Sequence, residues 1–131
     1  MRHLEVIELT VEEAEALRLK GEVLLKQGRR GHWTQFETVQ EARKILEQSL
    51  ALDDSDPVAH RSLGIAYGIL KMEEEAEREL KRALELDFQD YIAHNNLSYL
   101  YKLQGKSGES RREWIESLKI NPGQLLGFFK K

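Results

Sequence analysis

His60 and His94 are the residues of this chain whose type and spacing best suit a chemical task, because the same residue recurs after 34 positions. Imidazole binds Zn²⁺ or moves a proton, but a metal site needs rings that converge together with further ligands. Stacked helices hold equivalent positions about 10 Å apart, and the pattern supplies no carboxylate or cysteine partner. We therefore expect no metal site and no cofactor, and we interpret both rings as packed at a seam between helices.

Acidic and basic side chains are abundant, but they form no catalytic set. Pairs such as Glu74–Arg78 and Glu77–Lys81 have the (i, i+4) spacing of opposite charges on a solvated helix face. The sequence contains no glycine-rich phosphate loop and no nucleophile in a recognisable setting. We therefore expect that the protein is not an enzyme.

Asn95, Asn96 and Tyr99 point to binding rather than catalysis. Adjacent asparagines inside a helix have poor helix propensity and no role in an apolar core. Their amides are suited to hydrogen bonds with the backbone of an extended peptide, and the tyrosine ring is suited to pack beside it. A solvated helix face is the alternative interpretation of the same residues.

Basic and aromatic residues also mix in the segment 29–36, which contains Arg29, Arg30, His32, Trp33 and Phe36. Loops on a rigid scaffold often carry recognition, so this segment is a candidate contact surface. Alternatively, Trp33 and Phe36 cover the end of a helix pair. The sequence leaves both interpretations open.

Composition excludes several classes of function. The 131 residues carry 20 basic and 23 acidic side chains, for a net charge of −3, and the two signs are interleaved, which argues against nucleic-acid binding. There is no cysteine, and 40% of the residues are hydrophobic. No window reaches the roughly 18 apolar residues of a membrane span, so we expect a cytoplasmic protein without membrane insertion.

The elements that position these residues follow a repeat of 34 positions. Ala59, His60, Leu63 and Tyr67 recur as Ala93, His94, Leu97 and Tyr101. A period of this length is typical of stacked helical units that each bury an apolar face on the next. Helical spacing of apolar residues predicts helices over 10–28, 35–52, 57–70, 73–86, 91–104 and 107–119.

Helix-start signals set several of these bounds. Thr10 with Glu13 and Thr34 with Glu37 have the capping-box spacing, and Asp56 and Asp90 stand where a carboxylate caps a helix. Asn121 before a proline repeats that signal. Residues 1–9 are expected to form an arm that docks loosely against the first helix, with a disordered end as the alternative. Gly21 lies within a predicted helix, which indicates that a neighbouring helix packs close to it.

The residues Leu63, Gly64, Tyr67, Ala76, Leu80 and Ala83 have the spacing of the tetratricopeptide repeat, which the chain resembles over about residues 14–122. The resemblance implies an all-α, right-handed α-solenoid of three antiparallel helix pairs. We expect the pairs at 10–54, with a nine-residue insertion, at 55–89 and at 90–122, followed by a capping helix at 123–131. It also implies a concave groove lined mainly by the first helix of each pair.

The resemblance further implies a scaffold or adaptor that binds a peptide or protein of unnamed identity in this groove. With Trp33 from the loop, the implied contact residues are Arg18, Glu22, Arg61, Ile65, Ile69, Asn95, Asn96, Tyr99 and Lys102. Some family members grip a terminal carboxylate with lysine, arginine and asparagine. Glu22, Ile92 and Asn96 depart from that pattern, so we do not expect a carboxylate clamp.

The last residues offer an alternative function. Leu125, Leu126, Phe128 and Phe129 lie within a few positions of one another. Two adjacent phenylalanines cannot both face one neighbouring helix, so one ring would be available for contact with a second copy. The alternative is therefore a structural module that forms homo-oligomers through this helix or through the N-terminal arm.

Overall fold

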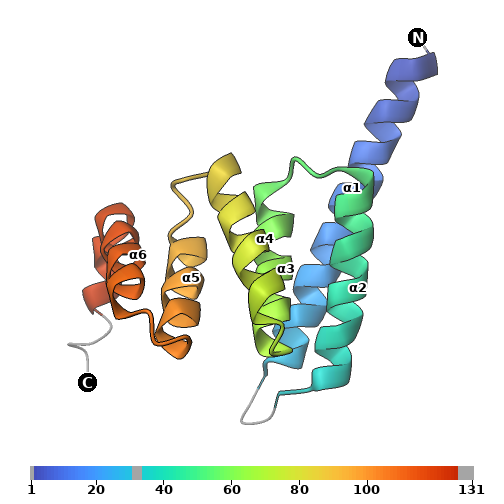
Figure 1. Cartoon of the computed structure of the whole chain (residues 1–131). Helices are drawn as coiled ribbons and strands as arrows, with labels where there is room; N and C mark the ends of the chain where they lie inside the picture. The colour runs from blue at the N-terminus through green and yellow to red at the C-terminus, as the bar shows by residue number, and fades with distance from the viewer. Residues whose placement is uncertain (1, 31–33, 127–131) are drawn as a thin grey trace.

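The structure is a computed structural model that describes residues 2–30 and 34–126, with side chains described from Glu8 onward. The described residues form six α-helices and one 3-10 turn (Figure 1). The elements are α1 (Arg2–Gly28), α2 (Phe36–Leu52), α3 (Pro57–Ile69), α4 (Glu73–Leu86), α5 (Tyr91–Leu103), α6 (Ser107–Ile120) and η1 (Pro122–Leu125). The all-α prediction is confirmed, and α2 to α6 lie within one residue of their predicted bounds.

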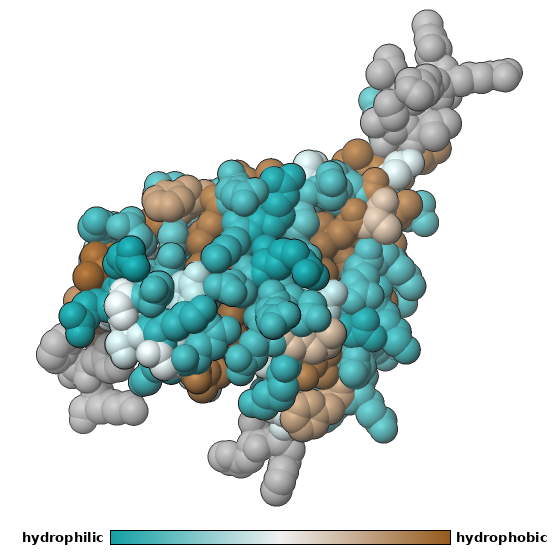
Figure 2. All heavy atoms as spheres, in the orientation of Figure 1, coloured by the Kyte–Doolittle hydropathy of each residue, from teal (hydrophilic) through white to brown (hydrophobic). Residues whose placement is uncertain are grey.

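The six helices pack in consecutive pairs, α1 with α2, α3 with α4 and α5 with α6. The pairs stack along one direction, because α2 also packs on α3, and α4 on α5 (Figure 1). On the face of the molecule in Figure 2, hydrophilic residues cover most of the surface. The paired arrangement confirms the predicted array of three helix pairs.

Small residues allow the two helices of a pair to approach closely. A Cβ at Gly21 would lie 2.6 Å from Leu46 Cγ, and a Cβ at Gly64 would lie 2.8 Å from Leu80 Cγ. Both distances are too short for a real side chain, so each glycine receives a leucine from the partner helix. The close contact predicted at Gly21 is confirmed.

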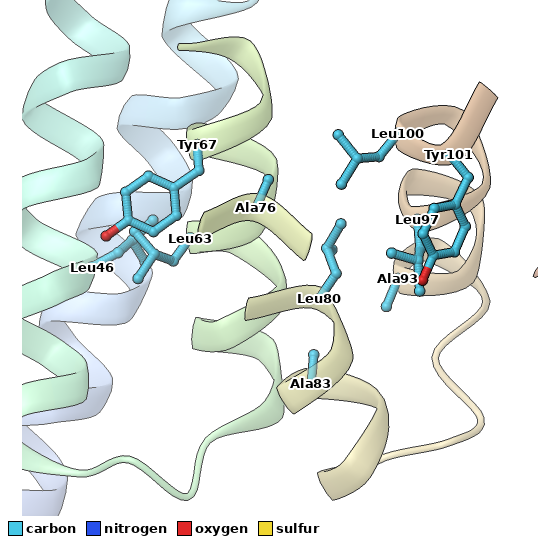
Figure 3. Close-up of a cluster of buried hydrophobic side chains, with 10 residues drawn as sticks. All are labelled: Leu46, Leu63, Tyr67, Ala76, Leu80, Ala83, Ala93, Leu97, Leu100 and Tyr101. Carbon is cyan, nitrogen blue, oxygen red and sulfur yellow. The ribbon is translucent and has the colours of Figure 1, made fainter. Parts of the chain in front are cut away.

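The main core is continuous from the first pair to the third (Figure 3). Leu46 of α2 lies with Leu63 and Tyr67 of α3, and Leu80 of α4 faces Leu97 of α5. These residues recur at the 34-position period, so each unit buries the same apolar face on the next. The result is a rigid support for whatever α3 and α5 present on their other face.

Ion pairs and caps join successive units at one end of the helices. The carboxylates of Asp56 and Asp90 cap α3 and α5, as predicted, by accepting backbone N–H groups of the first turn. Each also meets an arginine of the preceding first helix: Arg18 Nε lies 2.7 Å from Asp56 Oδ2, and Arg61 Nη1 lies 2.9 Å from Asp90 Oδ2. One carboxylate therefore both starts a helix and holds the neighbouring unit.

The predicted N-terminal arm is wrong, because α1 begins at Arg2 and passes through Thr10 without interruption. Residues 2–13 contain neither glycine nor proline. Extending an existing helix needs no new nucleation, so the capping-box residues do not stop it. The N-terminal turns of α1 project beyond the other helices (Figure 1).

Two other predicted caps are also wrong. Helix α2 is preceded by Gln35 rather than capped by Thr34, and no side chain caps it. The backbone N–H of Gln35 donates instead to the carbonyl of Gly28 at 2.8 Å. This bond joins the two ends of the α1–α2 connection, and the position before α2 is Gln35, one residue after the predicted cap Thr34. Asn121 makes no side-chain cap, because the Gln124 amide holds that turn by donating to the carbonyls of Ser117 and Asn121.

The predicted capping helix 123–131 falls largely beyond this turn. Its first described residues belong to η1, a 3-10 rather than an α-helical turn. Phe128 and Phe129 lie outside the described residues, so the structure does not test the predicted self-association through them.

Candidate partner-binding groove

A groove of about 440 Å³ lies between α3 and α5 and reaches the connection between α1 and α2. Ile65, Gly68 and Ile69 line it from α3, and Asn96, Tyr99 and Leu103 line it from α5. The other lining residues are Arg29, Thr34, Phe36, Gly64, Lys71, Glu73, Ala76, Leu80 and Leu100. The groove is thus mainly apolar along its length and polar at one end.

Large apolar side chains in this groove remain open to solvent. Tyr99 is 63% exposed, Phe36 is 55% exposed and Leu103 is 54% exposed. A Cβ at Gly68, which also lines the groove, would meet nothing within 4 Å, so there is open space beside this residue of α3. Apolar side chains around an open concave surface are the usual composition of a binding site.

Some predicted contact residues lie in this groove. Ile65, Ile69, Asn96 and Tyr99 line it, although the Asn96 amide donates to the Ile92 carbonyl of its own helix at 2.8 Å. That bond uses one N–H of the amide and leaves its second N–H and its carbonyl oxygen without a side-chain partner inside the described protein.

Other predicted contact residues are engaged within the protein. The Asn95 amide donates to Gln124 at 2.5 Å and accepts from the Ser117 hydroxyl, so it faces α6 and η1 instead of the groove. Asn95 and Gln124 stand at the same separation of 29 residues as Arg61 and Asp90. Asn95 therefore continues the series of contacts between units, as the repeat period could have shown.

The charged residues predicted from the first two units also pair internally. Besides Asp56, Arg18 contacts Glu22 at 2.8 Å and Glu15 at 3.5 Å, so all three of its partners are carboxylates. Arg61 is paired with Asp90. Lys102 is exposed but does not line the groove, and Trp33 lies outside the described residues.

Sequence reasoning missed Gly68, Lys71 and Leu103 as groove residues. Gly68 carries no apolar signal, and Leu103 falls at the end of its helix. The repeat period does distinguish Lys71, because the equivalent residue 34 positions later, in the next unit, is Gly105. Both residues have positive φ, 65° for Lys71 and 75° for Gly105.

The two histidines lie away from the groove and connect the helices of a pair. His60 contacts Glu79 Oε2 at 2.6 Å and the Asp54 carbonyl at 2.7 Å. His94 repeats the arrangement with Glu113 at 2.6 Å and the Phe88 carbonyl at 2.9 Å. Both rings are buried, so each serves the packing of its unit, as the sequence indicated. The expectation that neither ring has a carboxylate partner was wrong, because Glu79 and Glu113 come from the second helix of each pair.

The environment of His60 affects its titration. Burial lowers the pKa of His60, but hydrogen bonds to the Glu79 carboxylate and to the Asp54 carbonyl favour the protonated ring and raise its pKa above the ordinary value.

Among the residues that the structure describes, no group of three or more His, Cys, Asp or Glu side chains is placed to hold a metal ion.

No helix in the described part of the chain has the length and apolar character that a membrane crossing requires.

The chain matches no protein-family model and no curated protein. Its structure nevertheless aligns with several solved structures. The second TPR domain of Spaghetti (RPAP3), bound to the HSP90 peptide SRMEEVD, aligns with a TM-score of 0.78 at 19% identity, over 89% of this chain and 99% of that one.

A TPR domain of Arabidopsis OM64 aligns with a TM-score of 0.77 at 15% identity, over 87% of each chain. The chain has the tetratricopeptide-repeat fold. MamA is also similar, with a TM-score of 0.75 at 21% identity, over 91% of this chain and 64% of that one. The groove between α3 and α5 is therefore a groove between the first helices of two successive tetratricopeptide-like units.

Proposed function

We propose that this protein is a non-enzymatic interaction module that binds an extended segment of another protein in the groove between α3 and α5. The observation that carries the proposal is the groove itself, in which Tyr99, Phe36 and Leu103 remain more than half exposed around open space. When a partner covers exposed apolar side chains, the complex is stabilised by about 25 cal/mol for each Å² of apolar surface that is removed from water.

The rigid framework around the groove supports the same function. The leucine contacts at Gly21 and Gly64 hold the two helices of a pair together, and the paired arginines join successive units. A preformed surface loses little conformational entropy when a segment binds. The tetratricopeptide-repeat domain of Spaghetti, which shares the fold, holds a peptide.

Gly68 provides a test that leaves the core untouched. Gly68→Phe places a ring in the open space of the groove, and replacing a helical glycine favours the helix. Gly108 is the matched control, because a Cβ there also meets nothing within 4 Å and the residue does not line the groove.

The measurement is selection of a displayed random peptide library on the wild-type protein and on both variants, with unfolding curves as a check of folding. We expect enrichment of peptides by the wild type and by Gly108→Phe, and loss of that enrichment with Gly68→Phe. Equal enrichment by all three proteins would show that the groove is not the binding site.

A further inference from the structure

Lys71 has a backbone conformation that its residue type disfavours. It follows α3 with φ of 65°, in the left-handed region where the Cβ of an L-residue approaches the following carbonyl. The equivalent residue after α5 is Gly105, which has φ of 75° and no Cβ. A lysine is therefore present where the same chain uses glycine for the same turn.

The two turns are otherwise alike. The N–H of Met72 donates to the Tyr67 carbonyl at 2.9 Å, and the N–H of Lys106 donates to the Tyr101 carbonyl at 2.9 Å. Neither turn needs a side chain at its left-handed position, so the fold gives no reason for the lysine. A strained residue that the fold does not require is evidence for a functional contact.

The place of Lys71 identifies that contact. Its side chain lines the groove together with that of Arg29, which directly follows α1, and both are exposed. Within residues 8–30 and 34–126, neither side chain has an ion-pair partner, whereas Arg18 and Arg61 are both paired. Two cations thus stand at one end of a mainly apolar groove.

Charge around the groove differs from that of the whole chain. The protein has a net charge of −3, yet the charged residues that line the groove are two cations and one carboxylate, Glu73. Glu73 belongs to the first turn of α4, where the helix N-terminus stabilises a carboxylate. The groove therefore presents a local excess of positive charge to its occupant.

We propose that Lys71 and Arg29 form a binding position for an acidic side chain of the segment that occupies the groove. This inference rests on the proposed function and specifies the chemistry of the partner segment. The segment carries a large apolar side chain, which covers the surface around Tyr99 and Ile65, and an aspartate or glutamate near it in sequence, which meets Lys71 and Arg29. Such a groove distinguishes partners by charge as well as by shape, because it favours a segment with an acidic side chain at this position over one without it.

The test is the composition of the peptides that a random displayed library yields on three proteins. These are the wild type, Lys71→Gly and the double variant Arg29→Glu/Lys71→Glu. Lys71→Gly gives the turn the residue that Gly105 provides in the sibling unit, so loss of binding cannot be attributed to misfolding. Lys20→Gln is the control, since Lys20 is exposed and does not line the groove.

We expect wild-type peptides to combine aspartate or glutamate with a large apolar residue, and the double variant to select lysine or arginine instead. A synthetic wild-type peptide should bind Lys71→Gly about fivefold more weakly, the effect of one partly exposed charge pair, and should bind Lys20→Gln unchanged. Peptides without acidic bias, or with the same bias on the double variant, would overturn the inference while leaving groove binding intact. Failure of the proposed function has a separate signature, because peptides would then also enrich on Gly68→Phe.

Discussion

Exchanging the residues at the two left-handed turns measures the strain at Lys71 directly. Lys71→Gly removes a Cβ from a conformation that costs a non-glycine residue about 1–2 kcal/mol. The glycine adds freedom to the unfolded chain, which offsets about 0.4–1 kcal/mol of that gain. The lysine side chain is exposed, so no buried surface is lost. We therefore expect the free energy of unfolding to rise by about 0.5–1 kcal/mol.

The reciprocal change, Gly105→Ala, has the opposite sign. A Cβ at Gly105 would meet nothing within 4 Å, so only the backbone conformation opposes it. We expect a loss of about 1 kcal/mol in the free energy of unfolding. Together the two variants separate backbone conformation from side-chain packing.

The assay for both variants is urea unfolding followed by circular dichroism, with the denaturant slope checked to be unchanged. If Lys71→Gly unfolds at the same or lower urea concentration than the wild type, the turn is not strained and the functional interpretation of Lys71 loses its basis. A Gly105→Ala protein as stable as the wild type would contradict the same reasoning.

Three further predictions concern the framework of the groove. Asp90→Ala should lose about 2 kcal/mol in urea unfolding, since it removes a helix cap and the partner of Arg61, whereas Asp90→Asn keeps the cap and should lose less. The pKa of His60 is raised in the folded state by its bond to Glu79. Its stabilising effect is therefore complete below about pH 6.5 and is lost as pH rises through the raised folded pKa; wild-type stability should fall over this window, and His60→Gln should show a smaller fall in urea titrations at each pH. Gly64→Ala should lose about 1–3 kcal/mol by overpacking, seen as a lower urea midpoint.

Much of the fold follows from the 34-position period. The glycines, alanines and leucines that recur at this period are the residues that pack one helix on the next, so their spacing carries the pairing of the helices. Bounds fixed by proline or by Asp56 and Asp90 were predictable for the same reason. The start of α1 was not, because a capping pattern at Thr10 cannot stop a helix that continues on both sides.

The candidate site was predictable only in part. Ile65, Asn96 and Tyr99 line the groove because the period places them on the open face of the first helices. Asn95 does not line it and instead contacts the following unit, which its position one period after Arg61 could have indicated. The position of Lys71 depends on the backbone of a turn, which apolar periodicity does not describe.

The most direct test of groove binding is an NMR titration of the ¹⁵N-labelled protein with a peptide selected on the wild type. We predict that the amide signals of Ile65, Gly68 and Tyr99 shift progressively, because these residues line the groove between α3 and α5. The signals of Leu19 and Val23, two exposed residues of α1 that do not line the groove, should stay in place. Shifts confined to Leu19 and Val23, with the groove signals unchanged, would contradict the proposed function.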